Sequence, residues 1–306
     1  MLEELKTFIT VVEQNNFTKA ATQLHLSQPT VSAHIKHLEE RFQTALIQRS
    51  IKQKHIVITP SGYKLFQFAK EILNLVECAY KAVPAVDDDL YGTIKVGASL
   101  TIGEYIMPNF LAEFKKKYPK LNVELYINNS TSICNKIKEL TLDIGFIEGM
   151  STSPEFKQDY FFKDQLVIAF PYEEDFENKK LSVKELQHQK WIVRESGSGT
   201  RSYLDNFLNQ YQLIPDCIMV VGSNYAIKEA VKNNLGITLI SYFVAQVAKQ
   251  HKELSIVYLD EKFSRQFSYI MPAQMPRTNK VDILLKEFKA YCKTIVVPFG
   301  MNGLEE

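Results

Sequence analysis

The amino-terminal fold is set by residues 26–38, which read LSQPTVSAHIKHL. Ser27 is a typical residue for the position just before a helix, and Pro29 suits the first helical turn because the N–H it lacks would be unpaired there. Val31, Ile35 and Leu38 then fall on one face of the helix. Small polar and basic side chains occupy the opposite face, namely Pro29, Thr30, Ser32, Ala33, Lys36 and His37.

Two further helices are predicted before this one. Apolar residues at the spacing i, i+3, i+4 and i+7 indicate a first helix that ends at Asn15 and Asn16, and these residues are Leu5, Phe8, Ile9 and Val12. A second, short helix is expected to begin at Thr18, whose hydroxyl could cap the following amides. A short helix, a tight turn and a helix with a polar free face make an arrangement that fits the DNA major groove. A generic three-helix domain would show the same apolar spacing.

Charge is distributed unevenly along the chain. Residues 1–83 hold ten Lys and Arg against seven Asp and Glu, whereas residues 84–306 hold 26 against 28, so the net charges are +3 and −2. A basic excess confined to one small domain is typical of a surface that faces phosphates. The run from Arg49 to Lys54, followed by the short strand pattern of His55–Ile58, predicts a β-ribbon wing in which Lys52 and Lys54 lie near phosphates. The alternative is a solvated surface turn.

A long helix is predicted after the wing, from Pro60 to about Val83, with Thr59 as its cap. Its apolar residues alternate in steps of four and three, as in a coiled coil, and they are Leu65, Ala69, Ile72, Val76, Ala79 and Val83. The simplest partner for such a stripe is a second copy of the chain, which predicts a homodimer. The alternative is that the stripe packs on its own wing domain. Residues 84–90, with three consecutive aspartates, are expected to form a hinge.

The remainder of the chain shows the alternating strands and helices of an α/β fold, for which we expect mainly parallel sheets. Strands are predicted near 94–98, 123–127, 143–147, 166–170, 191–193, 217–221, 237–240, 255–258 and 267–271, with a last helix around 280–294. Pro108 should kink the first helix of this part or divide it. Trp191 is expected in the core, where its indole N–H needs a partner.

Four loops that follow predicted strands are small and rich in hydroxyl groups. They are Ser99-Leu100-Thr101, Asn129-Ser130-Thr131, Ser196-Gly197-Ser198-Gly199-Thr200 and Ser223-Asn224. Each stands where a helix is expected to begin, and helix amino termini at the carboxyl ends of strands are suited to bind anions. Each loop taken alone could equally be an ordinary helix cap.

Several classes of protein lack support in the sequence. No apolar stretch approaches the ~20 residues of a membrane span, and the start of the chain lacks a basic export signal, so we expect a cytoplasmic protein without membrane contact. Cys78, Cys134, Cys217 and Cys292 show no zinc-type spacing; they are expected to be ordinary thiols, with a redox switch at Cys134 as the alternative. An enzyme lacks its usual motifs, since residues 97–101 miss the last glycine of a Gly-x-Ser-x-Gly elbow. A transport-type solute-binding protein would not need residues 1–83.

The amino-terminal motifs resemble those of LysR-type transcriptional regulators. The resemblance rests on Phe17–Ala21, Leu24, Ser27–Ser32, Ile35, Leu38-Glu39, Leu46, Arg49 and Thr59–Gly62, and it extends over essentially the whole chain. It implies that Gln28, Pro29, Ser32 and Ala33 face base edges, and that Thr18, Ser27, Thr30, Lys36 and Arg49 hold phosphates. The chain departs from the family at Ile47, where a Phe is common, and at Ala33, which replaces a longer polar residue and could contact a thymine methyl.

The second half is similar to the type II periplasmic-binding-protein fold of LysR effector domains, in which two α/β lobes are joined by two crossings, here near residues 165 and 266. The resemblance implies a winged helix-turn-helix at 1–59, a linker helix at 60–83, a hinge at 84–90 and an effector domain at 91–298, with lobe I at about 91–165 and 267–298 and lobe II at about 166–266. It further implies that the ligand is lined by Ser99, Leu100, Thr101, Ser130, Phe146, Ser196, Ser198, Thr200 and Ser223.

Residues 97–103 and 194–201 are similar to the branch of the family that regulates sulfur assimilation and carbon fixation. That branch suggests a small anionic metabolite as the effector, with Arg194 or Arg201 nearby, and no bound cofactor or metal. The family resemblance also implies double-stranded promoter DNA as a partner, pairing of homodimers into homotetramers, and contact with RNA polymerase. A ligand that closes the lobes is expected to change the spacing of the winged domains and the bend of the DNA.

Overall fold

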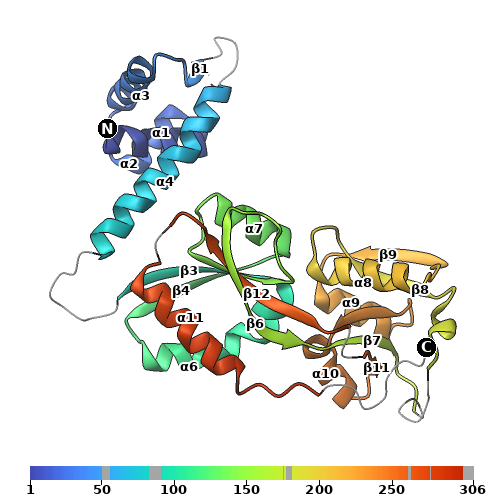
Figure 1. The fold of residues 1–306 in the computed structure, drawn as a ribbon. Helices are drawn as coiled ribbons and strands as arrows, with labels where there is room; N and C mark the ends of the chain where they lie inside the picture. Colours follow the sequence, from blue (N-terminus) through green and yellow to red (C-terminus); the bar gives the residue numbers. More distant parts are fainter. Residues whose placement is uncertain are drawn as a thin grey trace. The chain divides into compact units, whose positions relative to one another are not determined.

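The computed structural model describes residues 1–49, 56–82, 91–174, 176, 181–260, 263–275 and 277–298. Lys52, Lys54 and the expected hinge at 84–90 lie outside the described residues. The chain forms two compact units, Met1–Asp87 and Asp88–Glu306 (Figure 1). Each unit has its own hydrophobic core, and each is described separately.

The first unit is a helical domain with a two-stranded ribbon. Its elements are α1 (Leu2–Gln14), α2 (Phe17–Leu24), α3 (Gln28–Phe42), β1 (Ile47–Arg49), β2 (Ile56–Ile58) and α4 (Pro60–Ala82). Left-handed residues close the first three helices at Asn15, His25 and Gln43, and these residue types tolerate or form such turns. β1 and β2 pair in antiparallel fashion, which confirms the predicted wing ribbon at the level of the backbone.

The core of this unit lies between α1, α2, α3 and the start of α4. Val31, Ile35 and Leu38 are buried there, as their spacing predicts. Leu65 and Ala69 are buried in the same core, so the first part of the predicted coiled-coil stripe packs on its own domain. Among the described side chains of α4, Tyr63, Phe68, Ile72 and Leu75 are the large apolar or aromatic ones that are exposed, and the last three, at 60%, 37% and 53% exposure, share one face of the helix. The unpartnered stripe therefore follows Phe68, Ile72 and Leu75, and the predicted stripe was wrong at its first two positions.

The second unit contains two sheets. The first sheet has the order β4-β3-β5-β12-β6, and its strands are β3 (Gly92–Ala98), β4 (Leu121–Ile127), β5 (Ile144–Glu148), β6 (Phe156–Asp164) and β12 (Arg265–Pro272). β4 and β5 run parallel to β3, whereas β12 runs antiparallel to both β5 and β6. Figure 1 shows α7 (Ser130–Lys138) on one face of this sheet, and α6 (Met107–Lys117) and α11 (Asn279–Cys292) on the other.

The second sheet has β7 (Leu166–Pro171) between β10 (Thr238–Ser241) and β11 (Leu254–Tyr258), both antiparallel to it. β8 (Lys190–Arg194) and β9 (Cys217–Val221) run parallel, and a bridge between Trp191 and Ile237 joins them to β10. Its helices are α8 (Gly199–Gln210), α9 (Asn224–Lys232) and α10 (Tyr242–Gln250), with a short 3-10 helix at Val183–Leu186. Both sheets are mixed, so the expectation of mainly parallel sheets was wrong.

The chain passes from the first sheet to the second between β6 and β7, and it returns between β11 and β12. Gln165 stands at the first passage and is fully buried. Its Nε2 donates to the carbonyl oxygens of Leu166 (2.7 Å) and Leu259 (2.8 Å), which ties the two passages together. The predicted division at Pro108 is confirmed, because α5 (Leu100–Tyr105) ends just before α6 begins.

Candidate functional site

The free face of α3 is the first candidate surface. Gln28, Pro29, Ala33 and Lys36 are exposed, while Thr30 and Ser32 are half-buried. The Ser27 hydroxyl accepts a hydrogen bond from the amide of Thr30 (3.2 Å), so Ser27 caps α3 as predicted. Gln28 Nε2 donates to the Ser32 hydroxyl (3.3 Å). The side chains expected to meet DNA therefore gather on one solvent-facing side of the helix.

A hollow of about 420 Å³ lies beside this face. Three predicted DNA-contact residues, Ser32, Ala33 and Lys36, line it on the α3 side. The other lining residues are Phe17, Ile35, Glu39 and Ile47. Glu39 also accepts from the amides of Leu46 (2.8 Å) and Ile47 (3.1 Å), which anchors the start of the wing to α3.

The capping residue of α2 differs from the predicted one. Thr18 is exposed in the first turn of α2, but the cap of α2 is Asn16, whose Oδ1 accepts from the amides of Thr18 (2.8 Å) and Lys19 (3.0 Å). The capping role expected of Thr18 was therefore wrong. Arg49 ends β1, and its side chain lies outside the described residues.

The second candidate site lies where the two sheets of the second unit meet, around Arg265. This guanidinium is fully buried; its Nε donates to Asp164 Oδ2 (2.6 Å), and its Nη1 lies 3.1 Å from Glu148 Oε2. The Ser241 hydroxyl donates to Asp164 Oδ1 (2.7 Å). One buried cation is thus shared by two buried carboxylates.

Two of the predicted ligand residues, Thr101 and Thr200, contact both Glu148 and Arg265. Thr200 donates to Glu148 Oε2 from both its amide and its hydroxyl, each at 3.1 Å. The Thr101 amide donates to Glu148 Oε1 (3.4 Å). Arg265 in turn donates to the hydroxyls of Thr200 (2.8 Å) and Thr101 (3.2 Å). Helix termini of both lobes therefore hold one carboxylate of the chain itself.

The two carboxylates have opposite pKa shifts. Burial alone would raise the pKa of Glu148, but the Arg265 charge and the hydrogen bonds from Thr101 and Thr200 outweigh it, so this pKa is lowered. Burial raises the pKa of Asp164 to about 6, because Arg265 and Ser241 offset the desolvation only in part and the Glu148 charge adds to it.

The other predicted ligand residues have different surroundings. Phe146 is fully buried in the first core, where its ring packs against Phe161 and Phe288. Ser223 caps α9 by accepting from the Ala226 amide (3.1 Å), as an ordinary helix cap does. The remaining residues start helices or precede them, and these are Ser99, Leu100, Ser130, Ser196 and Ser198.

A polar rim surrounds this junction. Arg194 Nε donates to Glu195 Oε2 and its Nη2 to Glu195 Oε1, both at 2.8 Å, and its Nη1 donates to Asn224 Oδ1 (2.8 Å). Asn129 Nδ2 reaches across to Glu195 Oε1 (3.1 Å), and the Thr131 amide donates to the Gly197 carbonyl (3.1 Å). Ser99 Oγ is buried and has no hydrogen-bond partner among the described residues.

The three central charged residues were missing from the sequence predictions. Glu148, Asp164 and Arg265 each stand at the end of a strand where the chain leaves or enters a sheet. A charged residue at the end of an apolar strand could have indicated these positions, because a charge that is buried with the strand is rare unless it is paired. Nothing in the local pattern, however, indicates that residues 148, 164 and 265 meet.

The surroundings of the Cys134 thiol bear on the alternative of a redox switch at this residue. The thiol is partly buried, and burial raises its pKa although Lys138 lowers it in part. Since the thiolate is the reactive form, a raised pKa favours the ordinary thiol over the switch. Cys292 is buried, with its pKa raised to about 12, and Cys217 is exposed.

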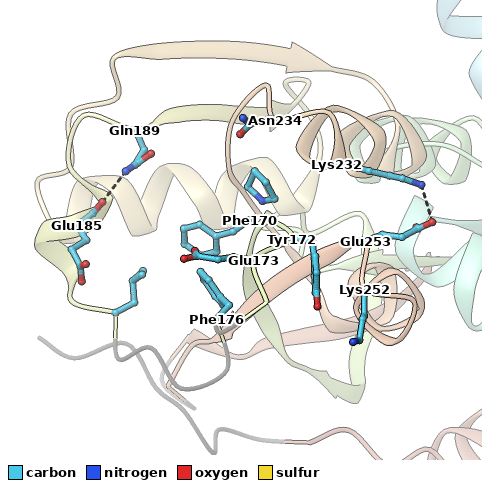
Figure 2. Close-up of a pocket in the computed structure, with 12 residues that line it drawn as sticks. Phe170, Tyr172, Glu173, Phe176, Glu185, Gln189, Lys232, Asn234, Lys252 and Glu253 are labelled. Atoms are coloured by element: carbon cyan, nitrogen blue, oxygen red, sulfur yellow. Dashed lines mark hydrogen bonds and ion pairs between the residues drawn. The ribbon is translucent and has the colours of Figure 1, made fainter.

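A separate pocket of about 790 Å³ lies at the far end of the second sheet (Figure 2). Figure 2 shows Phe170, Tyr172 and Phe176 among its lining residues, together with the ion pair between Lys232 Nζ and Glu253 Oε1 (2.7 Å). None of the predicted ligand residues lines this pocket.

Among the described residues, no cluster of three or more His, Cys, Asp or Glu could hold a metal. No helix in the described part of the chain is long and apolar enough to cross a bilayer.

Two family models match the chain. Residues 2–63 match the bacterial regulatory helix-turn-helix protein of the lysR family, and residues 87–293 match the LysR substrate binding domain. The chain is 41% identical to the HTH-type transcriptional regulator CysL of Bacillus subtilis over 94% of this chain and 96% of CysL. It is 30% identical to a probable RuBisCO transcriptional regulator of Phaeodactylum tricornutum, over 94% and 96% of the two chains.

The fold is also found in solved structures. A full-length OxyR variant from Pseudomonas aeruginosa superposes with a TM-score of 0.76 at 20% identity, covering 97% of this chain and 99% of that one. At this identity the likeness concerns the fold alone. Both halves match family models, and the sequence relatives are regulators rather than enzymes. The chain therefore belongs to the LysR family of DNA-binding transcriptional regulators, in the branch whose relatives include CysL and the RuBisCO regulators.

Proposed function

We propose that this regulator reads duplex DNA with the free face of α3 and changes its promoter binding or bending when a small anion binds between the two lobes. The proposal that α3 reads DNA is supported by the separation of its two faces. Val31, Ile35 and Leu38 are buried. Gln28, Ala33 and Lys36, on the opposite face, are exposed. A recognition helix needs that separation, because its outward side chains must reach base edges.

Individual roles follow from side-chain chemistry. Gln28 and Ser32 can bond base edges, and the Ala33 methyl group can contact a thymine methyl beside the adjacent hollow. Thr18, Ser27, Thr30, Lys36 and Arg49 are proposed to contact phosphates, together with Lys52 and Lys54 of the wing. Since the target is chromosomal DNA, we propose that the protein acts in the cytoplasm.

The test is fluorescence anisotropy of the full-length protein with labelled duplexes from the region upstream of its own gene. Ala33→Glu places a carboxylate on the exposed face of α3, and it should weaken binding at least tenfold without changing the melting temperature. The control is Gln14→Glu, which adds the same charge at the exposed end of α1. If Ala33→Glu binds the duplex as tightly as Gln14→Glu, α3 does not read the DNA.

The effector site is proposed at the junction around Thr101 and Thr200, with lobe I at about 91–165 and 267–298 and lobe II at about 166–266. Hydrogen-bond donors from both lobes converge there on one anionic group, which supports an oxyanion as ligand. Calorimetry against sulfate, other sulfur oxyanions and sugar phosphates tests this proposal, with Thr200→Ala as control. Binding that Thr200→Ala leaves unchanged would place the effector elsewhere.

Self-association is proposed to couple the effector site to DNA. Two surfaces support it: the exposed α4 stripe of Phe68, Ile72 and Leu75, and strand β9, whose apolar side chains are largely exposed. Symmetric dimers present two recognition helices to two half-sites, and pairing of dimers gives a tetramer. A change at the lobe junction would then alter the spacing of the half-site contacts and hence the DNA bend. Contact with RNA polymerase is part of the same proposal.

A further inference from the structure

The junction between the lobes already contains an anion, which is the side chain of Glu148. This carboxylate accepts hydrogen bonds from the Thr101 amide, the Thr200 amide and the Thr200 hydroxyl, and it lies 3.1 Å from Arg265 Nη1. These donors belong to both lobes. A small oxyanion that bridges two lobes would use the same kinds of donors, namely free amides at the start of a helix, hydroxyls and a guanidinium.

Close packing leaves little room for a second group at this position. A side chain on Gly199 would overlap Glu148, with a Cβ atom 2.5 Å from Glu148 Cβ and 2.8 Å from its carbonyl oxygen. Glu148, Thr101, Thr200 and Arg265 are all buried. An added ion therefore cannot reach these donors while the Glu148 side chain keeps its place.

The charge balance leads to the same conclusion. Arg265 is the cation in contact with Glu148 and Asp164, and the negative charge of these two carboxylates already exceeds its own. Arg194, the next cation at the junction, is held by both oxygens of Glu195. An external anion beside Glu148 would add a like charge in a buried site, which is costly.

We propose that Glu148 is a built-in occupant of the effector site, and that an external oxyanion binds by displacing its carboxylate from Thr101, Thr200 and Arg265. In the effector-free regulator Glu148 holds the two lobes together, and the incoming anion takes over that role while the side chain moves away. The inference rests on the proposed function of this junction as the effector site. The buried, unpartnered Ser99 hydroxyl in the loop before Thr101 is a further donor for the incoming ion.

The test compares sulfate and inorganic phosphate binding by full-length wild type and Glu148→Gln, using calorimetry. Glutamine keeps the shape of the side chain but removes the charge that competes for Arg265. Glu148→Gln should bind sulfate at least tenfold more tightly than wild type. Thr200→Val in the Glu148→Gln background should abolish the gain. Glu104→Gln is the matched control, because Glu104 is another acid near Arg194 and Asn224 that does not contact Arg265.

A second variant covers the case in which Glu148→Gln does not fold. Glu148→Ala removes the whole carboxylate, and acetate or sulfate should then raise its melting temperature more than that of wild type at equal concentration, or restore its circular dichroism spectrum if it is unfolded. The proposal is overturned if Glu148→Gln binds sulfate no more tightly than wild type or Glu104→Gln, or if neither ion stabilises Glu148→Ala beyond wild type.

The same samples separate this inference from the proposed function. DNA binding by the wild type is measured by anisotropy in chloride buffer, and it requires no displacement of Glu148. If the wild type binds its upstream DNA and Glu148→Gln gains no sulfate affinity, the displacement proposal fails and the regulator remains. If the wild type binds no DNA, the proposed function fails, whatever the calorimetry shows.

Discussion

Arg265 sets the protonation of two acids at once. Its guanidinium is close enough to Glu148 to keep that carboxylate ionised, while Asp164, also buried and also bonded to Arg265, keeps a raised pKa of about 6. One positive charge cannot fully compensate two negative charges in a buried site. Asp164 is therefore the group at this junction that takes up a proton under mildly acidic conditions.

This pKa shift gives a pH dependence of stability with a defined sign. The pKa of Asp164 rises from 3.8 to about 6 on folding, so between these values the folded state binds a proton that the unfolded state has released. The contribution of Asp164 to stability is then largest below about pH 4 and is lost as the pH rises to about 6. The loss is on the order of 3 kcal/mol, at 1.36 kcal/mol per pKa unit.

Urea unfolding of wild type and Asp164→Asn between pH 4.5 and 7.5 measures this effect. Subtracting the two curves should leave a difference that changes through pH 5–6 and is flat above pH 7. Ser182→Ala, at an unrelated helix cap, serves as the control for general acid effects. Parallel curves for wild type and Asp164→Asn would show that Asp164 does not titrate in this range.

The α3 surface separates two kinds of DNA contact. Lys36 is exposed and pairs loosely with Glu40 (3.4 Å), so it is available to a phosphate. Lys36→Ala should weaken binding to all duplexes alike and lower the slope of log affinity against log salt by about 0.9 per subunit.

Gln28→Ala should reduce the free energy of binding to the cognate duplex by about 1–3 kcal/mol and change binding to other duplexes little. Anisotropy titrations at several salt concentrations distinguish the two, and sequence-dependent loss for Lys36→Ala would reverse the assignment.

The residues of α3 could be predicted because a single helix determines which of its faces is apolar. The Glu148 cluster could not, because residues 101, 148, 164, 200 and 265 meet only after two sheets have formed and joined. Phe146 shows the same limit. Adjacent strand residues point to opposite faces, so Phe146 and Ile147 enter different cores, and the local sequence does not indicate which core each residue joins.

At the level of elements, α4 is joined to the wing at Gly62. A Cβ atom at this position would overlap the Leu46 carbonyl oxygen and lie 2.9 Å from Ile58 Cγ2. The Thr59 hydroxyl nearby accepts from the Gly62 amide (2.9 Å) and donates to the Ala45 carbonyl (2.8 Å). Glycine is therefore required by the close approach of helix and strand.

Gly62→Ala should destabilise the first unit by about 1–3 kcal/mol, the usual cost of forcing extra atoms into a packed site. Urea unfolding and the anisotropy assay check this, and DNA affinity should fall together with stability. Gly222→Ala is the matched control, because a Cβ atom there meets nothing within 4 Å. Equal stability of the two variants would mean that the wing relaxes at no cost.

Most strands were predictable from short apolar runs, but their pairing was not. β6 was missed because its sequence, FKQDYFFKD, neither alternates nor forms an apolar run, and it relies on β12 for its place in the sheet. The expectation of mainly parallel sheets was wrong at β7 and β12, which have antiparallel neighbours. Strand direction depends on contacts between distant segments, which local pattern does not encode.

For the whole molecule, self-association is proposed to depend on the exposed α4 stripe. In a dimer that packs through this stripe, Leu75→Glu would place one carboxylate from each subunit in the apolar contact. Burying these charges should cost the free energy of association about 3 kcal/mol or more. Sedimentation velocity should show a shift toward monomers, and DNA affinity should fall at least tenfold because the two half-sites are no longer linked. Glu71→Gln, exposed on the same helix, should change neither. A Leu75→Glu protein that remains dimeric would place the contact elsewhere.

The exposed edge strand β9 is expected to affect the solubility of the protein at high concentration. Among the described residues its backbone pairs with β8 alone, and the side chains of Ile218, Met219 and Val220 are largely in solvent. A bare, apolar strand edge is a template for indiscriminate pairing between chains. Variants that come apart into subunits are therefore expected to precipitate on concentration, and a lysine in place of Val220 should keep such subunits in solution.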